Sequence, residues 1–319
     1  MRVRLQIACI SLALLAGAGT ATAQAPAPDP ATDSAPLFAS STTLDRIGRV
    51  IAPVTINGRG PFRLVVDTGA SHSTFSPRLA AELGLTPSFE NSLLLNGVTG
   101  VAQVPTVPVD RIQAGDVVIE RTQVPVVWSS IMADADGILG VAGLRAERIL
   151  VDFRHDRIVI TRSRSRAETG GFLLIPARRV AGGLLQAEAI IGGISTRVVI
   201  DTGAERSLGN LALRDALQNA ARKRNRQGRW SDAQVFGATE QVAHGQAAIA
   251  PNMHLGPLTI SHTEIIFGDF HIFKLWKMDK RPAALIGMDV LGTVEAMVLD
   301  YQKGEIYVDV TPPHKLARD

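Results

Sequence analysis

The chain has 319 residues, of which 46% are hydrophobic and 20% are charged, and its formal net charge is +3. This length is enough for one large domain or two smaller domains with a buried core. The nearly even charge balance argues against a nucleic acid as a partner.

The first 23 residues have the pattern of a secretory signal peptide. Arg2 and Arg4 precede a mostly apolar run over residues 5–16, and Ala21-Thr22-Ala23 supplies small residues for cleavage. We therefore expect the mature chain to begin at Gln24, with a net charge of +1, and to be periplasmic or secreted. A retained anchor is the alternative, but we expect no stable membrane insertion after cleavage.

The only cysteine, Cys9, lies in this signal. The mature chain therefore has neither a disulfide nor a thiol nucleophile. Residues 24–42 are rich in Ala, Pro and Ser, a composition typical of a disordered linker.

The first folded half is predicted over residues 43–163. Strands over 50–56 and 61–66 flank Asn57-Gly58, a strong hairpin-turn dipeptide. A short helix is then predicted from Pro77, with Ser76 as its N-cap and Gly84 at its end. Further strands are expected in this order: 93–100 with a turn at Asn96-Gly97, 106–112, 117–127, and a closing hairpin over 149–153 and 157–160.

The second half, predicted over residues 172–312, repeats this order after a polar linker over 164–171 and is followed by a tail over 313–319. Its expected elements are a hairpin over 184–191 and 195–200, a helix from Leu211 to about Arg224 capped by Asn210, a turn near 235–239, and a closing hairpin over 297–301 and 305–308. The repetition predicts two similar lobes.

One motif occurs at the same place in both halves. Asp67-Thr68-Gly69-Ala70 follows a strand-like apolar run, and so does Asp201-Thr202-Gly203-Ala204. A single Asp-Thr-Gly is weak evidence, whereas two copies in matching positions are specific. Burying one carboxylate is costly, but two that face each other can share a proton. A duplication whose turns are only structural is the alternative.

An apolar pair followed by glycine also occurs twice, as Ile138-Leu139-Gly140 and Leu285-Ile286-Gly287. With these motifs the chain resembles the retropepsin-like and pepsin-like aspartic proteases, most closely exported bacterial members with a retroviral-type motif. The resemblance implies an all-β fold of two pseudo-twofold-related, β-barrel-like lobes, each with one or two short helices. It also implies an endopeptidase that acts on extended peptides without metal or cofactor, and a monomer that supplies both catalytic carboxylates.

The same resemblance implies roles for the two motifs. Asp67 and Asp201 would be the catalytic pair, and the two apolar-apolar-Gly segments would pack behind their loops. The loops would be supported by interlocked threonine hydrogen bonds and by glycines that let the backbone approach the carboxylates: Thr68, Gly69, Ala70, Thr202, Gly203 and Ala204.

Two hairpin tips would act as flaps over the substrate. Their residues are Gly97, Val98, Thr99 and Gly100 in the first half and Gly237, Ala238 and Thr239 in the second. Glu205 stands where retroviral enzymes often have an acidic residue that contacts the substrate backbone, whereas the first half has Ser71 there. We therefore expect an asymmetric cleft.

Pepsins place Ser or Thr where this chain has Ala70 and Ala204. Losing a hydroxyl that donates to the charged carboxylate raises its pKa. We expect activity at mildly acidic to near-neutral pH and not at strongly acid pH.

Other functions fit the sequence less well. A peptide-binding or scaffold protein with an unused carboxylate pair is the main alternative. A metalloenzyme is disfavoured because His244, His254, His262 and His271 lack tight ligand spacing. A serine hydrolase is disfavoured because Gly-x-Ser-x-Gly is absent. The basic cluster over residues 222–229 reads as a solvated helix end, with an acidic partner as the alternative.

Overall fold

The computed structural model describes residues 38–41, 43–44, 48–114, 117–128, 132–141, 147–155, 157–163, 169–225 and 228–310. It confirms the all-β class, with 52% of residues in strands and 14% in helices. The expected signal peptide, residues 164–168 of the expected linker and the expected tail lie outside the described residues. Residues 38–41, at the end of the segment expected to be a disordered linker, form a strand.

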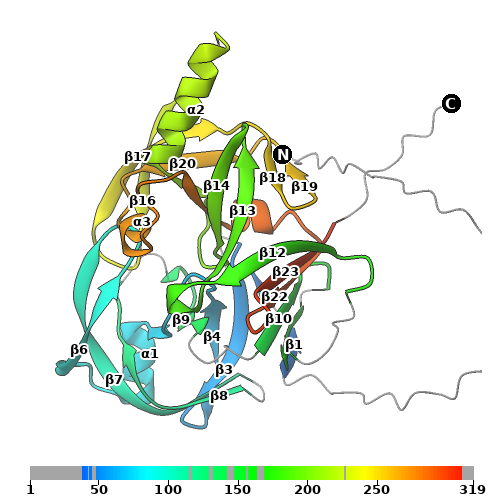
Figure 1. Cartoon of the computed structure of the whole chain (residues 1–319). Coiled ribbons are helices and arrows are strands. Elements are labelled where there is room, and N and C mark those ends of the chain that lie inside the picture. Colours follow the sequence, from blue (N-terminus) through cyan, green and yellow to red (C-terminus); the bar gives the residue numbers. More distant parts are fainter. Residues whose placement is uncertain are drawn as a thin grey trace, which may run out of the picture.

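The first half of the chain builds an eight-stranded sheet (Figure 1). Its path is β5-β9-β4-β3-β7-β6, with β2 added on β3 and β8 on β7. The strands are β2 (Thr43–Leu44), β3 (Val50–Ile56), β4 (Arg59–Val66), β5 (Thr74–Phe75), β6 (Ser88–Asn96), β7 (Val101–Ala114), β8 (Val117–Pro125) and β9 (Gly137–Leu139). The helix α1 (Pro77–Leu83) also lies in this half.

The remaining strands form a fifteen-stranded sheet. They are β1 (Phe38–Ser41), β10 (Glu147–Asp152), β11 (Arg157–Arg162), β12 (Leu173–Arg179), β13 (Leu185–Ile191), β14 (Ile194–Ile200), β15 (Leu208–Asn210), β16 (Ser231–Phe236), β17 (Val242–Ile249), β18 (Met253–Leu255), β19 (Leu258–Ile260), β20 (Glu264–Gly268), β21 (Ala283–Ile286), β22 (Ala296–Asp300) and β23 (Glu305–Asp309). The second half also contains α2 (Leu211–Lys223), α3 (His271–Leu275) and α4 (Met288–Leu291), more helices than the one or two expected.

The predicted helix starts are confirmed by their caps. The Ser76 side chain accepts a hydrogen bond from the Leu79 amide at the start of α1, and Asn210 accepts one from the Leu213 amide at the start of α2. Each satisfies one of the amides that a helix start leaves unpaired. Gly84 ends α1 with φ 74°, a left-handed conformation that costs glycine little.

The predicted turn between β3 and β4 is also confirmed. Asn57 and Gly58 have φ values of 49° and 75°, which suit a two-residue hairpin turn. The returning strand β4 is buried at Leu64, Val65 and Val66, so it enters the core just before the first Asp-Thr-Gly.

Both apolar-apolar-Gly segments lie beside the strands that lead to the aspartates. β9 runs parallel to β4, with Leu139 opposite Val66, and β21 runs parallel to β14, with Ile286 opposite Ile200. A parallel neighbour shields each of these strands, which explains why both read as continuous apolar runs.

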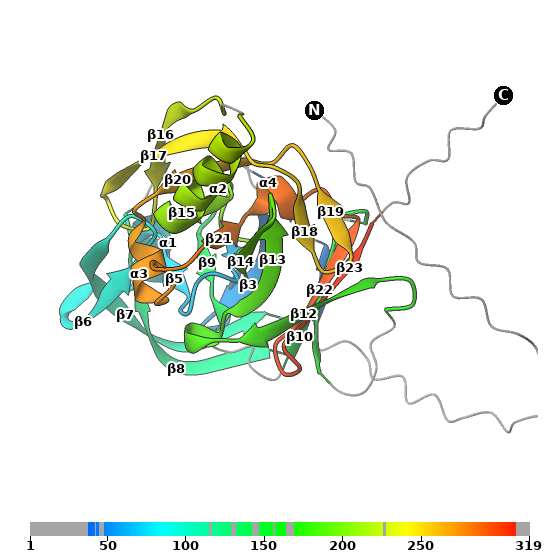
Figure 2. The ribbon, with the colours of Figure 1, turned by 45° about the horizontal axis from the view of Figure 1, so that its top comes forward.

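The two closing hairpins, β10–β11 and β22–β23, meet in one sheet. β10 pairs with β22 in antiparallel fashion, and Leu150 lies opposite Val298. β1 pairs with β11 and β12 pairs with β23, so these six strands form one continuous layer within the larger sheet (Figures 1 and 2). The two halves of the chain are therefore joined by backbone hydrogen bonds as well as by side-chain packing. None of the helices in the described part of the chain is long and apolar enough to span a membrane.

Candidate active site

The two Asp-Thr-Gly turns begin in the same way. The Asp67 amide donates to the Leu139 carbonyl at 3.1 Å as the chain leaves β4, and the Asp201 amide donates to the Ile286 carbonyl at 3.0 Å as it leaves β14. Each aspartate is therefore held at the end of a buried strand by the neighbouring apolar-apolar-Gly segment.

Two threonines interlock the turns. Thr68 Oγ1 donates to the Ile200 carbonyl at 2.9 Å and accepts from the Thr202 amide at 3.0 Å. Thr202 Oγ1 donates to the Val66 carbonyl at 2.6 Å and accepts from the Thr68 amide at 3.1 Å. Both side chains are buried, and each hydroxyl uses its proton and a lone pair across the junction. The interlocked threonines predicted from the resemblance are therefore present in the geometry.

Each carboxylate is also held by its own turn. Asp67 Oδ1 accepts from the amides of Gly69 at 2.8 Å and Ala70 at 2.9 Å. Asp201 Oδ1 accepts from the Gly203 amide at 2.9 Å and the Ala204 amide at 3.2 Å. At both alanines the donor is a backbone N–H, because alanine has no hydroxyl.

The two carboxyl groups face each other across the turns. A methyl group added to Gly69 would overlap the carboxyl group of Asp201, and one added to Gly203 would overlap that of Asp67. Each aspartate side chain also influences the pKa of the other. Only glycine leaves room for this approach, which accounts for its presence in both motifs.

The surroundings favour a shared proton. Burial raises the pKa of Asp67, and the Gly69 amide, the Asp201 side chain, the Ala70 amide and the charge of Arg49 partly oppose the rise. Burial raises the pKa of Asp201 well above its ordinary value, and the negative charge of Asp67 raises it further. Burial and the closeness of the two carboxyl groups thus favour a pair that holds one proton.

The two predicted flap tips meet. The first lies between β6 and β7, where the Gly97 amide donates to the Gly100 carbonyl at 2.9 Å, and the second lies between β16 and β17. Thr99 Oγ1 and Thr239 Oγ1 are 2.7 Å apart, within hydrogen-bond distance. Figure 1 shows the two hairpins converging from opposite halves on the side of the molecule that carries α3.

The hairpin that carries the first predicted flap also reaches the surroundings of both Asp-Thr-Gly turns. Leu95 packs against an apolar cluster that Ala70 also contacts, and Val98 packs against a second cluster that Ala204 also contacts. This hairpin therefore packs against one apolar cluster from each half of the chain. This packing brings residues of the first hairpin close to both Asp-Thr-Gly turns, although the second turn lies about a hundred residues further along the chain.

The position after each Ala differs between the halves, as expected. The Ser71 hydroxyl lies 3.0 Å from His72 Nδ1. The side chain of Glu205 is exposed, while its backbone carbonyl accepts a hydrogen bond from the Asp289 amide at 3.1 Å. Glu205 is therefore anchored through its backbone, and its carboxylate is free to face solvent or a bound molecule.

Sequence reasoning missed a pair of supporting serines. Ser73 Oγ accepts from the Gly140 amide at 3.2 Å, and Ser207 Oγ accepts from the Gly287 amide at 3.1 Å. Ser207 Oγ also donates to Asp289 Oδ1 at 2.7 Å. The available signal was that both serines follow their Asp by the same number of residues.

Two large polar side chains near the aspartates were also missed. Arg49 is only 2% exposed and Tyr301 only 1%. The charge of Arg49 acts on Asp67, and both aspartates act on Tyr301. Neither residue belongs to a recognisable motif. Arg49 lies just before β3, and Tyr301 lies just after β22.

No three side chains of the His, Cys, Asp and Glu types lie close enough to hold a metal ion within the described ranges. Two cavities found in the described part of the chain lie elsewhere. One is bounded by the start of α2 and by α3, and the other is an apolar space lined by residues such as Ile200 and Met297. The candidate site is therefore defined by the meeting of the two Asp-Thr-Gly turns and of the two hairpin tips.

Comparison with known proteins bears on the first half of the chain. Residues 52–142 match the family model described as aspartyl protease. This segment runs from β3 past β9, so it includes the Asp67 turn and the first flap. No curated protein matches the chain. The expected resemblance to retropepsin-like aspartic proteases is therefore confirmed over residues 52–142, which are similar to the aspartyl protease family model.

Proposed function

We propose that this protein is an aspartic endopeptidase that hydrolyses peptide bonds with a water molecule activated between Asp67 and Asp201. The observation that carries the proposal is the interlocking of two Asp-Thr-Gly turns, which holds the two buried carboxyl groups against each other. Such a pair shares one proton, because two adjacent carboxylates cannot both ionise easily.

The chemistry follows from that shared proton. The ionised carboxylate takes a proton from the water as its oxygen attacks the peptide carbonyl carbon, and the protonated carboxyl group donates to the carbonyl oxygen. In the tetrahedral intermediate that results, the peptide nitrogen takes a proton and the C–N bond breaks. The products are a free carboxyl group and a free amine.

The two halves of the chain supply equivalent parts of this site. Leu150 and Val298, which stand at matching positions of the two closing hairpins, pair with each other across the shared sheet. This register supports a pseudo-twofold relation between lobes at residues 43–163 and 172–312, with a cleft between them. One chain then supplies the complete pair, so a monomer suffices.

The substrate in this proposal is a peptide in extended conformation, held between the carboxylates and the two flap tips. Its backbone would add to the exposed edges of the flap hairpins. The signal-like first 23 residues support action outside the cytoplasm, in the periplasm or after secretion.

The test is cleavage of a mixed peptide library by the protein that begins at Gln24, across a series of pH values. Asp67→Asn and Asp201→Asn should each lower turnover by at least about a thousandfold. Asp215→Asn, at an exposed position on α2, is the matched control and should leave turnover unchanged. A statine-type inhibitor should block the activity.

A wild type that binds peptides without turnover at any pH would contradict the proposal. It would favour a peptide-binding protein built on the same fold.

A further inference from the structure

The last two residues of β6 are held by opposite halves of the chain. The Leu95 side chain packs against an apolar cluster of first-half residues that include Val65 and Ile138. The Asn96 side chain reaches the second half, where its Oδ1 lies 3.2 Å from His271 Nε2. Successive side chains of a strand point to opposite faces, so the two contacts do not compete for the same space. The end of β6 is therefore held from both sides.

His271 belongs to a well anchored helix. It is the first residue of α3, and the next two residues, Ile272 and Phe273, are 7% and 1% exposed within an apolar cluster of the second half. The Met278 amide donates to the Phe273 carbonyl at 2.8 Å, and the Met278 carbonyl accepts from the side-chain amide of Asn210 at 2.7 Å. α3 lies beside β6 in Figures 1 and 2. The imidazole is thus presented to β6 from a fixed position.

The tip of the first flap is a separate unit from the end of β6. Its loop begins with Gly97 and ends with Gly100, and the Gly97 amide donates to the Gly100 carbonyl at 2.9 Å. Between them, Thr99 contacts the opposite tip through the hydroxyl of Thr239 at 2.7 Å. Glycine has the widest choice of backbone conformations, so a loop with a glycine at each end can change shape while the strands behind it stay in place.

We propose that His271 is a positioning residue that holds the neck of the first flap, where Asn96 pairs with Val101, so that only the tip loop over residues 97–100 opens to admit a peptide. This inference rests on the proposed function and deepens it. A peptide has to part the two tips, whereas the contact between His271 and Asn96 is made by the strand and persists. The peptide therefore meets a hairpin whose neck is already in place, and binding does not have to order it.

The first experiment needs no activity. His271→Ala removes the contact, so amide hydrogen exchange followed by NMR should become about two- to tenfold faster at the end of β6 and the start of β7, the loss expected for one hydrogen bond. His271→Gln places an N–H near the position of Nε2 and should restore slow exchange. His254→Ala is the matched control, because the exposed His254 ring contacts the Thr259 hydroxyl instead. Unchanged exchange in His271→Ala, or an equal increase in β3 and β4, would overturn the inference.

The second experiment separates KM from kcat on a single peptide. His271→Ala should raise KM about two- to tenfold with little change in kcat, because the two Asp-Thr-Gly turns are untouched. His271→Gln should recover most of the wild-type KM, and His254→Ala should leave it unchanged. A role in stability alone would lower the amount of active enzyme, so a fall in kcat with an unchanged KM would overturn the inference.

The third experiment asks which part of the hairpin opens. Cys9 is the only cysteine of the chain and lies outside the expected mature protein, so introduced pairs react only with each other. Thr99→Cys with Thr239→Cys should form a disulfide across the tips and abolish turnover until it is reduced. Asn96→Cys with His271→Cys, bridged by a short bis-methanethiosulfonate that reduction also removes, should keep turnover and show a lower KM than its reduced form.

Loss of turnover in both bridged proteins would show that the whole hairpin must open, and turnover with bridged tips would show that the tips need not part. Either result would overturn the inference. If the wild type shows no turnover, the proposed function fails, and hydrogen exchange in His271→Ala and His271→Gln still decides whether His271 holds the neck.

Discussion

The hydroxyls of Thr99 and Thr239, 140 residues apart in the chain, lie 2.7 Å from each other and join the tips of two hairpins. A methyl group added to Gly237 would come within 2.7 Å of Thr99 Oγ1, so the tips are also in close van der Waals contact. A peptide that enters from this side must part the tips, and the same contact can form again above it.

We therefore expect Thr99→Val and Thr239→Val to weaken substrate binding. Each loses one hydrogen bond, which is worth roughly 0.5–1.5 kcal/mol, so KM should rise about two- to tenfold with little change in kcat. Thr99→Ser keeps the hydroxyl and serves as the control. Steady-state kinetics on one peptide checks this, and an unchanged KM in both Val variants would show that the tips separate fully in the working enzyme.

The interlocked threonines should matter for stability as well as activity. Thr68→Val or Thr202→Val removes two cross-turn hydrogen bonds and leaves a buried amide and a buried carbonyl without partners. An unsatisfied buried group costs about 1–3 kcal/mol, so the free energy of unfolding should fall by roughly 2–4 kcal/mol. Chemical denaturation measures this.

Serine at either position retains both hydrogen bonds and should recover most of the loss. If Thr68→Val and Thr68→Ser were equally stable, the hydroxyl would contribute nothing to the junction.

The carboxyl pair should make the folded protein less stable as the pH rises. Burial raises the pKa of both Asp67 and Asp201 in the folded state. Their protonated forms therefore stabilise the fold fully below the unfolded pKa of about 3.9, and this stabilisation is lost as the pH rises through the folded values. Asp201→Asn removes one titrating group, so it should melt at a higher temperature than the wild type near pH 7.

Near pH 3 the two proteins should melt alike, because the wild-type pair is then protonated. Thermal melts across the pH range test this, with the exposed Asp232→Asn as the control. A difference that does not change with pH would show that packing, not ionisation, separates the two proteins.

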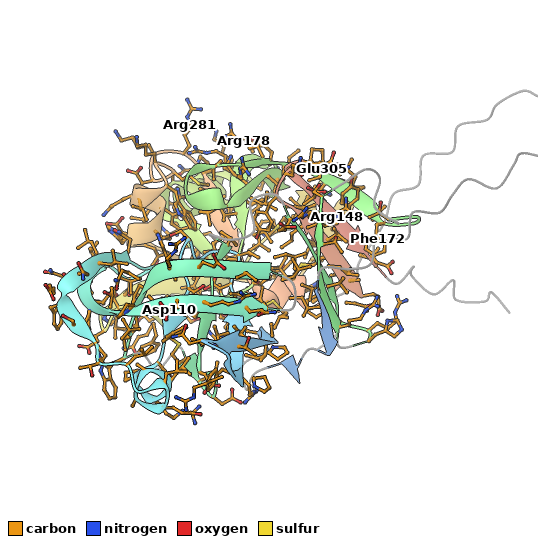
Figure 3. The ribbon with its side chains drawn as sticks, turned by 90° about the horizontal axis from the view of Figure 1, so that it is seen from below. Asp110, Arg148, Phe172, Arg178, Arg281 and Glu305 are labelled. Atoms are coloured by element: carbon orange, nitrogen blue, oxygen red, sulfur yellow. The ribbon has the colours of Figure 1, made fainter. Side chains whose placement is uncertain are left out.

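A buried ion pair connects the closing hairpins of the two halves. Asp300 is fully buried, and it accepts from Arg148 Nε at 3.2 Å and from Ser163 Oγ at 2.7 Å. Figure 3 shows Arg148 on the layer of strands that it shares with Glu305. Arg148→Met leaves the buried carboxylate without its cation and should lower the free energy of unfolding by about 3–5 kcal/mol.

The matched control is Arg154→Met. Arg154 lies 3.2 Å from Glu295 and also joins the two halves, but its side chain is 51% exposed. Exposed pairs contribute about 0–1 kcal/mol, so denaturation should detect only a small change. Equal losses in the two variants would mean that burial does not strengthen the Arg148 pair.

Local signals in the sequence predicted the local parts of the fold. The caps Ser76 and Asn210 and the turn Asn57-Gly58 are encoded within a few residues, so their structures could be read directly. The meeting of Asp67 and Asp201 was also predictable, because a repeated motif in a repeated order implies equivalent positions.

Contacts between distant strands were not predictable in the same way. The pairing of Leu150 with Val298 depends on how two hairpins with similar apolar patterns align, and nothing in either hairpin specifies its partner. Arg49 gave no signal because a single charged residue before a strand is normally solvated, whereas here its side chain is buried. Composition also misassigned residues 38–41, which form β1 by pairing with β11.

Because Ser71 and Glu205 differ, the two sides of the candidate site are chemically different. Two identical halves would present the same groups to both ends of a bound chain, and a peptide would fit equally well when turned end for end. Here the neutral Ser71 hydroxyl lies beside His72, while the exposed carboxylate of Glu205 stands at the matching place. If the proposed function holds, one peptide bound in the two opposite directions meets unlike surroundings, so the site can distinguish these two directions.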